Sequence, residues 1–155
     1  MPQDGDEAPD FMLPTESGEA LRLAKLKGKT VVLYFYPKDD TSGCTAEAKD
    51  FTRLAAEFRK AGVEVIGVSP DSVESHAKFR NKHDLSVRLA ADTDKAVANA
   101  YGVWVEKSMY GRKYMGVERA TFLIDKAGRI ARSWRKVKVP GHAEEVLAAA
   151  KALPR

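Results

Sequence analysis

The sequence predicts an α/β protein with a mixed central β-sheet flanked by helices. Apolar runs of strand length alternate along the chain with segments whose apolar residues recur at helical spacing, a pattern typical of parallel strands joined by helices. Near the C-terminus, two strand-like segments follow one another across a tight turn and lead into a last helix, which adds antiparallel pairing to the sheet. A chain of 155 residues suits one core, so we expect a single domain over residues 1–155.

The N-terminal part leads to the clearest strand of the chain. Residues 1–9 are expected to form a loose arm, and short strands are expected over 11–13 and 21–23. Residues 30–36 (TVVLYFY) join β-branched, aliphatic and aromatic side chains without interruption. This continuous run predicts a central strand that is buried on both faces.

A long helix is predicted over 44–60, after Pro37 and a polar loop over 38–43. Thr41, or the residues just after it, can cap the entrance of this helix, and Glu47, early in it, suits the positive end of the helix dipole. Residues at i, i+3, i+4 and i+7 form one apolar face, namely Phe51, Leu54, Ala55 and Phe58.

The rest of the chain continues the alternation of strands and helices. In chain order we expect a strand over 63–68, a helix over 71–84 capped by Asp71 or Ser72, a strand over 87–90, a helix over 94–101, an irregular segment over 103–117, strands over 118–124 and 129–134, and a helix over 142–153. A strand–helix–strand unit followed by two strands and a helix is the plan of the thioredoxin-like fold.

Composition excludes several classes of protein. The chain is 44% apolar and 31% charged with a net charge of +4, which is ordinary for a globular protein. No run is long and apolar enough to cross a bilayer. The first residues lack the basic and apolar parts of a secretory signal, so a cytoplasmic location is expected. The densest basic stretch, 129–138, indicates a solvated strand edge and not a nucleic-acid surface, because most cations alternate with acids.

The single cysteine, Cys44, excludes an internal disulfide and a cysteine-rich zinc site. A lone cysteine is most often a small buried apolar residue. Cys44, however, lies at the start of the predicted helix after a polar loop. Free N–H groups and the positive end of the dipole stabilise a thiolate there. Its position therefore favours a reactive nucleophile over a structural residue.

The residues before Cys44 resemble a known active site. Pro37, Thr41 and Cys44 form the pattern P-x-x-x-T-x-x-C, which resembles the active-site motif of the peroxiredoxins. The stretch YPKDDTSGCTAEA over 36–48 closely resembles the bacterioferritin comigratory, PrxQ-like subfamily. The resemblance extends over nearly the whole chain, through further segments at 8–11, 67–72, 109–111 and 116–125.

The resemblance implies a role for each of four residues. Cys44 would attack one peroxide oxygen and become a sulfenic acid. Thr41 would accept from the peroxide or orient the thiolate, although it can also be only a helix cap. Pro37 would shape and shield the pocket, or merely end the strand. Arg119 would hold the thiolate and the peroxide oxygens; a solvated edge arginine is the alternative. No cofactor and no metal are implied.

The chain departs from the family at the second cysteine. Many relatives carry a resolving cysteine where this chain has Lys49, and others carry it in the next helix, for which Arg80 is the best candidate position. We therefore expect a one-cysteine mechanism in which an external thiol reduces the sulfenic acid. Thioredoxin, glutaredoxin with glutathione, or a small thiol are all compatible. A monomer is expected, and a dimer linked through Cys44 is compatible too. Ser42 replaces a proline common in the subfamily, which should loosen the loop slightly.

Two alternatives to an antioxidant peroxidase acting on hydrogen peroxide or alkyl hydroperoxides remain open. The first is a redox sensor or relay on the same scaffold, and the second is a binding module with an inert cysteine. A Cys–His hydrolase is disfavoured because the three histidines show no matching signature, and a metal site is disfavoured for want of clustered ligands. Four apolar residues are candidates either for an alkyl-binding pocket or for the core: Tyr36, Trp104, Met109 and Tyr110.

Overall fold

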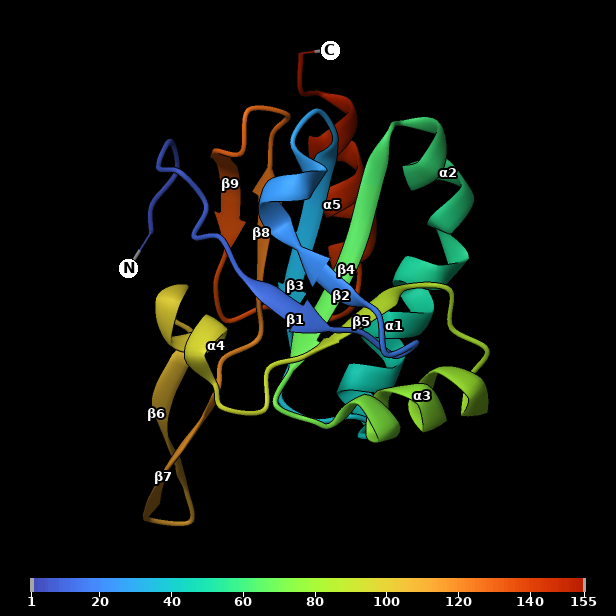
Figure 1. Cartoon of the computed structure of the whole chain (residues 1–155). Helices are drawn as coiled ribbons and strands as arrows, with labels where there is room; N and C mark the ends of the chain where they lie inside the picture. Colours follow the sequence, from blue (N-terminus) through green and yellow to red (C-terminus); the bar gives the residue numbers. More distant parts are fainter. Residues whose placement is uncertain (1, 155) are drawn as a thin grey trace.

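A five-stranded mixed β-sheet with strand order β5-β4-β3-β8-β9 forms the centre of the fold (Figure 1). The structure is a computed structural model that describes residues 2–154, so Met1 of the expected N-terminal arm lies outside them. Strand β3 (Thr30–Phe35) runs parallel to β4 (Val63–Ser69) and antiparallel to β8 (Ala120–Ile124). β5 (Arg88–Ala91) extends the parallel part, and β9 (Ile130–Trp134) extends the antiparallel part. The predicted mixed α/β sheet is confirmed.

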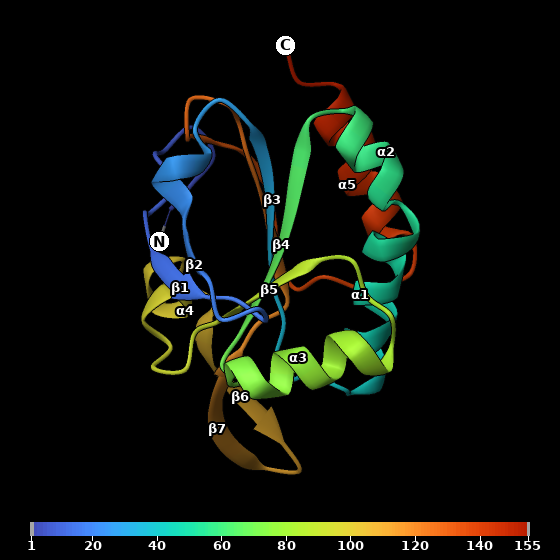
Figure 2. The ribbon, with the colours of Figure 1, turned by 45° about the vertical axis from the view of Figure 1, so that its right-hand side comes forward.

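Two layers cover the sheet, one on each face (Figure 2). The helical layer consists of α1 (Ser42–Arg53), α2 (Ala55–Lys60) and α5 (His142–Lys151), with α3 (Val73–Lys82) across its lower end. The opposite layer consists of β1 (Met12–Pro14), β2 (Ala20–Arg22), the 3-10 helix η1 (Leu23–Leu26) and α4 (Ala96–Ala100).

Strand β3 contributes side chains to both of the hydrophobic cores that these layers enclose. Val31, Leu33 and Phe35 lie in the cluster beneath β1, β2 and α4. Val32 and Tyr34 lie in the cluster beneath the helices. Because successive side chains of a strand point to opposite faces, a strand buried on both faces is apolar throughout. This explains the uninterrupted run in the sequence.

The long helix predicted over 44–60 differs from the structure in two ways. It begins two residues earlier, at Ser42, and it is interrupted at Leu54, where φ is −94° and ψ is 5°. The interruption is small, because the amide of Leu54 still donates to Asp50 and its carbonyl accepts from Phe58. The apolar face therefore continues across it, which is why the sequence pattern shows one helix.

The expectation of an irregular segment over 103–117 is wrong. Strands β6 (Trp104–Met109) and β7 (Arg112–Val117) form an antiparallel hairpin that extends away from the sheet (Figure 1). Its two turn residues, Tyr110 and Gly111, have φ values of 52° and 77°, as in the type I′ turns that favour two-residue hairpins. Most hairpin residues are exposed, so the strands carry no run of buried apolar residues that would reveal them.

Backbone segments outside the central sheet cover both of its edges. On the β9 side, the amide of Gly5 donates to the carbonyl of Ile130 (2.7 Å) and that of Ala8 to Gly128 (2.9 Å). The expectation of a loose arm over 1–9 is therefore wrong for this part of the arm. On the β5 side, the amide of Glu16 donates to Leu89 (3.0 Å).

The other predicted elements are found within a few residues of their expected bounds. Ser72 caps α3, since its hydroxyl accepts from the amide of Ser75 (3.1 Å). Within residues 2–154, no helix has the length and apolar character needed to cross a membrane.

One glycine of the sheet is required by a close contact. Gly67 of β4 lies opposite Tyr34 of β3, and a Cβ added to it would lie 2.7 Å from the Cζ and Oη atoms of that ring. The ring cannot move aside easily, because it is fully buried and stacks on Phe51 with ring centroids 4.7 Å apart.

We predict that Gly67→Ala lowers the free energy of unfolding by about 1–3 kcal/mol, as expected for an overpacked core. Chemical denaturation measures this loss. In a Tyr34→Leu background the loss should shrink, because the clashing ring atoms are gone. An equal loss in both backgrounds would contradict this explanation.

Candidate active site

Cys44 lies in the first turn of α1 and is buried, with 2% of its surface exposed. The helix begins after Thr41, so Cys44 is its third residue. N–H groups in this turn have no partner within the helix. The predicted position at a helix start is confirmed. The side chain also packs in the cluster beneath the helices, so Cys44 is at the same time a core residue.

Arg119, immediately before β8, contacts the cysteine directly. Its Nη2 donates to Sγ of Cys44 (3.2 Å), and its Nη1 donates to Oε1 of Glu47 (2.6 Å). The side chain is only 16% exposed, so it is not a solvated edge arginine. Gly43 leaves room for it, because a Cβ there would lie 3.2 Å from Nη2. Gly43 is thus part of the helix and not, as expected, the end of the polar loop.

Glu47 is a site residue whose place the sequence interpretation missed. It does not complement the helix dipole, since the first turn of α1 contains no acidic residue. Its side chain is 1% exposed and faces Arg119. Burial raises the pKa of Glu47 to about 7, although the charge of Arg119 and its hydrogen bond act in the opposite direction. Within the described part of the chain, neither Oε2 of Glu47 nor Oη of Tyr34 has a hydrogen-bond partner, and both are buried.

The hydroxyl of Thr41 points away from the helix. Thr41 occupies the N-cap position, but its side chain makes no cap hydrogen bond. Instead Oγ1 donates to the carbonyl oxygen of Lys38 (2.8 Å), so the expectation that the side chain of Thr41 caps the helix is wrong. A hydroxyl has one proton and two lone pairs. Because its proton is used, Thr41 presents lone pairs that can accept a hydrogen bond.

Pro37 lies at the junction between β3 and this loop and is half-buried. The structure thus brings Cys44 and Arg119 into contact and places Thr41 one turn before Cys44. Pro37 is linked to them through the loop, and its shielding role stays a prediction.

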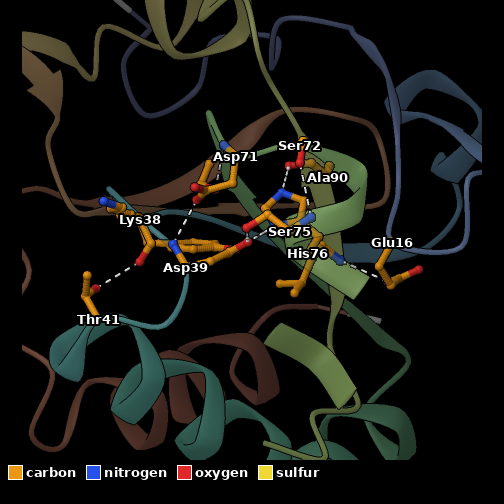
Figure 3. A network of polar contacts seen from close by, with 12 residues as sticks. Glu16, Lys38, Asp39, Thr41, Asp71, Ser72, Ser75, His76 and Ala90 are labelled. Carbon is orange, nitrogen blue, oxygen red and sulfur yellow. Dashed lines mark hydrogen bonds and ion pairs between the residues drawn. The ribbon is translucent and has the colours of Figure 1, made fainter. Parts of the chain in front are cut away.

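A network of polar contacts holds the loop at Asp39 (Figure 3). Its buried carboxylate accepts from Tyr36 Oη (2.6 Å) and Ser75 Oγ (2.8 Å), and it lies 2.7 Å from Nδ1 of His76. Its backbone amide donates to Oδ2 of Asp71 (2.8 Å). The ligand atoms of Asp39, Asp71 and His76 lie within 4.8 Å of one another. The expectation that potential metal ligands do not cluster is therefore wrong, although these atoms are engaged in hydrogen bonds.

A signal for this network was present in the sequence. Asp39 and Asp71 each follow a strand, and β3 and β4 are parallel neighbours. The carboxyl ends of such strands meet at one edge of the sheet, which brings the two polar turns together.

Asp40 ties the same loop to the C-terminal end of α3. Its carboxylate accepts from Lys82 Nζ (2.6 Å) and lies 2.8 Å from His83 Nε2. The hydrogen bonds of His83 and Lys82 hold the pKa of Asp40 below its usual range. The loop before Cys44 is therefore anchored to α3 at two successive residues.

The four candidate pocket residues do not come together. Tyr36 lies in the helix-side cluster, and Trp104 packs against the opposite cluster. Met109 and Tyr110 lie at the hairpin tip, where Tyr110 is 99% exposed. A common alkyl-binding pocket formed by these residues is therefore excluded.

The family of the chain follows from comparison with known proteins. The AhpC/TSA family matches residues 5–133. The chain belongs to this family. Peroxiredoxin Bcp of Bacillus subtilis is 50% identical over 143 residues, which cover 92% of this chain and 91% of that protein. Peroxiredoxin Bcp of Xanthomonas campestris is 48% identical over 143 residues, covering 92% and 89%.

A solved structure of the Xanthomonas campestris bacterioferritin comigratory protein superposes with a TM-score of 0.88 at 46% identity, covering 92% of this chain and 90% of that one. That study concerns its alkyl peroxide reduction activity. Peroxiredoxin Q from the same organism has also been solved with either of two cysteines replaced by serine. The chain is thus a Bcp/PrxQ-type peroxiredoxin with a thioredoxin-like fold. It is a thiol-dependent peroxidase, which acts on a peroxide and requires a thiol reductant.

Glu47 gives this peroxiredoxin a predicted pH dependence of stability. Its pKa is about 7 in the folded chain against an ordinary value of 4.5. Between these values the folded chain keeps a proton on Glu47 that the unfolded chain loses, so the contribution of Glu47 to stability is most favourable below pH 4.5 and falls as the pH rises from 4.5 through 7.

We expect the free energy of unfolding of the wild type, relative to Glu47→Gln, to fall by about 3 kcal/mol across this interval. Chemical denaturation of both proteins at a series of pH values measures it. A difference in unfolding free energy between the two proteins that stays constant with pH would show that burial does not raise the pKa of Glu47.

Proposed function

We propose that Cys44 is the residue that attacks the peroxide, with Arg119, Thr41 and Pro37 completing the catalytic site. The hydrogen bond from Arg119 Nη2 to Sγ (3.2 Å) carries this proposal. It places a permanently charged guanidinium against Sγ of the single cysteine of the chain. This sulfur lies at a helix start that also favours negative charge. A thiolate is stabilised there, and the thiolate is the nucleophilic form.

The proposed chemical step forms an S–O bond and breaks the O–O bond. The Cys44 thiolate attacks one peroxide oxygen and is oxidised to a sulfenic acid. The other oxygen takes both electrons of the O–O bond and leaves as water or an alcohol after gaining a proton. Negative charge moves from sulfur to this oxygen during the step, and Arg119 provides fixed donors that stabilise it.

Thr41 supports the step as a hydrogen-bond acceptor. Since its O–H donates to the carbonyl oxygen of Lys38, its lone pairs can accept the O–H of a hydroperoxide and orient it toward Sγ. Pro37 has no N–H and a fixed φ, so it supplies a rigid, non-donating wall where the loop leaves β3.

We propose a one-cysteine cycle. The positions at which relatives carry a second cysteine are occupied by Lys49, which is exposed, and Arg80, whose Nε donates to Val87 O (3.2 Å). The sulfenic acid therefore reacts with an external thiol to give a mixed disulfide and water, and a second thiol releases Cys44. Thioredoxin, glutaredoxin with glutathione, or a small thiol can supply these two thiol groups. The protein that they reduce is proposed to be a monomer.

The substrates proposed are hydrogen peroxide and organic hydroperoxides, in line with the alkyl peroxide reduction studied in the Xanthomonas relative. A single domain over residues 1–155 fits one central sheet that contributes to both cores. A cytoplasmic location fits the need for a reducing thiol pool.

A peroxidase assay with each reductant in turn tests the proposed function. Wild-type protein should consume hydrogen peroxide and an alkyl hydroperoxide with at least one of thioredoxin, glutaredoxin with glutathione, or dithiothreitol. Cys44→Ser should abolish this consumption, because the chain has no other thiol. Turnover that survives in Cys44→Ser would refute the role of Cys44. Rapid oxidation with negligible turnover on every reductant would instead favour a redox relay.

Mass spectrometry tests the one-cysteine cycle. One equivalent of hydrogen peroxide should add about 16 Da to the monomer, as expected for a sulfenic acid. Excess peroxide without thiol should add about 32 Da and end the activity, since no internal thiol traps the intermediate. Activity that persists through repeated excess peroxide without any thiol would contradict this cycle.

A further inference from the structure

The peptide group between Lys38 and Asp39 is held at both ends (Figure 3). Its carbonyl oxygen accepts from Oγ1 of Thr41 (2.8 Å), and its N–H donates to Oδ2 of Asp71 (2.8 Å). We propose that Asp71, which lies outside the P-x-x-x-T-x-x-C motif, is a positioning residue that orients Thr41 through this peptide. The inference rests on the proposed role of Thr41.

The rigidity of the peptide transmits the effect. A peptide group is planar, and in the trans form its N–H and C=O point in opposite directions. The structure contains no cis peptide bond among the residues described. When Asp71 holds the N–H, the direction of the Lys38 carbonyl on the other side is therefore fixed. The Thr41 hydroxyl donates to that carbonyl, so the direction of the carbonyl sets the orientation of the hydroxyl.

Asp71 is itself fixed by the central sheet. Its Oδ2 accepts from Oγ of Ser69 (2.6 Å), and its own amide donates back to this hydroxyl (3.2 Å). Ser69 is the last residue of β4 and is buried. The chain of contacts thus runs from a strand end through Asp71 and one peptide to Thr41.

The charge of Asp71 strengthens the bond that Thr41 makes. A carboxylate is a stronger acceptor than a neutral oxygen. A donor bond to it polarises the peptide and makes the Lys38 oxygen a better acceptor in turn. The Thr41 hydroxyl is therefore held as a donor to this carbonyl, and its lone pairs remain available for the O–H of the hydroperoxide.

The side chain of Asp39 is held by a separate set of contacts. Tyr36, Ser75 and His76 all contact its carboxylate. His76 Nε2 lies 3.0 Å from the carbonyl oxygen of Ala90, which can only accept, so this nitrogen carries a proton. Because these contacts do not involve the peptide, they provide a control. Ser75→Ala removes one hydrogen bond to Asp39 and leaves the bond to Asp71 in place.

A double-mutant cycle between Asp71 and Thr41 tests the proposal. Two rate constants are measured for each variant at the same pH: oxidation of Cys44 by hydrogen peroxide under single-turnover conditions, and alkylation of Cys44 by iodoacetamide, which does not use the Thr41 acceptor. Circular dichroism and the denaturation midpoint confirm that each variant is folded.

Asp71→Ala should slow oxidation about tenfold and change alkylation by less than about twofold, because the loss of a partly buried hydrogen bond to a carboxylate has an effect of this size. Asp71→Asn keeps an acceptor oxygen and should recover most of the rate. In a Thr41→Val background, Asp71→Ala should have no further effect on oxidation, since no hydroxyl is left to orient. Ser75→Ala should stay within about twofold of wild type.

Several results would overturn the proposal. Additive losses in Asp71→Ala and Thr41→Val would show that the two residues act separately. A parallel loss in alkylation, or an equal loss in Ser75→Ala, would show a general disturbance of the loop. Normal oxidation in Thr41→Val would instead refute the proposed role of Thr41 itself, and with it this inference, while the role of Cys44 would stand on the assay of Cys44→Ser.

Discussion

The contact of one guanidinium with both Cys44 and Glu47 is the constraint around which the site is built. Arg119 lies immediately before β8, whereas the two residues that it contacts lie on α1. Removing charges from water is costly unless they are paired and hydrogen-bonded. The raised pKa of Glu47 reflects this cost. Arg119 contacts the sulfur and the carboxylate at the same time, and Gly43 leaves the space for its guanidinium.

The sheet places the remaining groups through the ends of two strands. β3 and β4 are parallel neighbours, so the turns that follow them meet at one edge, where Asp39 and Asp71 join. The loop before Cys44 is thus attached to Ser69 at the buried end of β4. Its irregular backbone is held by side-chain acceptors, which explains how an exposed residue such as Thr41 keeps a defined orientation.

The sequence revealed those features that depend on local periodicity or on buried apolar runs. The central strand and the helical segment bearing Cys44 carry such patterns; the strand was predicted at nearly the observed bounds, and the helix was predicted without its interruption at Leu54. The β6–β7 hairpin was missed because its strands are mostly exposed and bury no apolar face. Glu47 was misinterpreted for a different reason. An acid near a helix start usually faces water, and only the approach of Arg119, 72 residues further along the chain, shows that it is buried. Arg119 was predicted as a site residue only from the resemblance to the family, because no local pattern in the sequence points to it.

The covered edges of the central sheet have a consequence for how these molecules behave in concentrated solution. A bare edge strand offers unpaired amides and carbonyls on which another chain can add a strand, the first step toward aggregates. Here the segment from Gly5 to Ala8 shields the β9 side, and Glu16 occupies part of the β5 side. These hydrogen bonds occupy backbone groups at both edges, so another chain would find fewer free amides and carbonyls there.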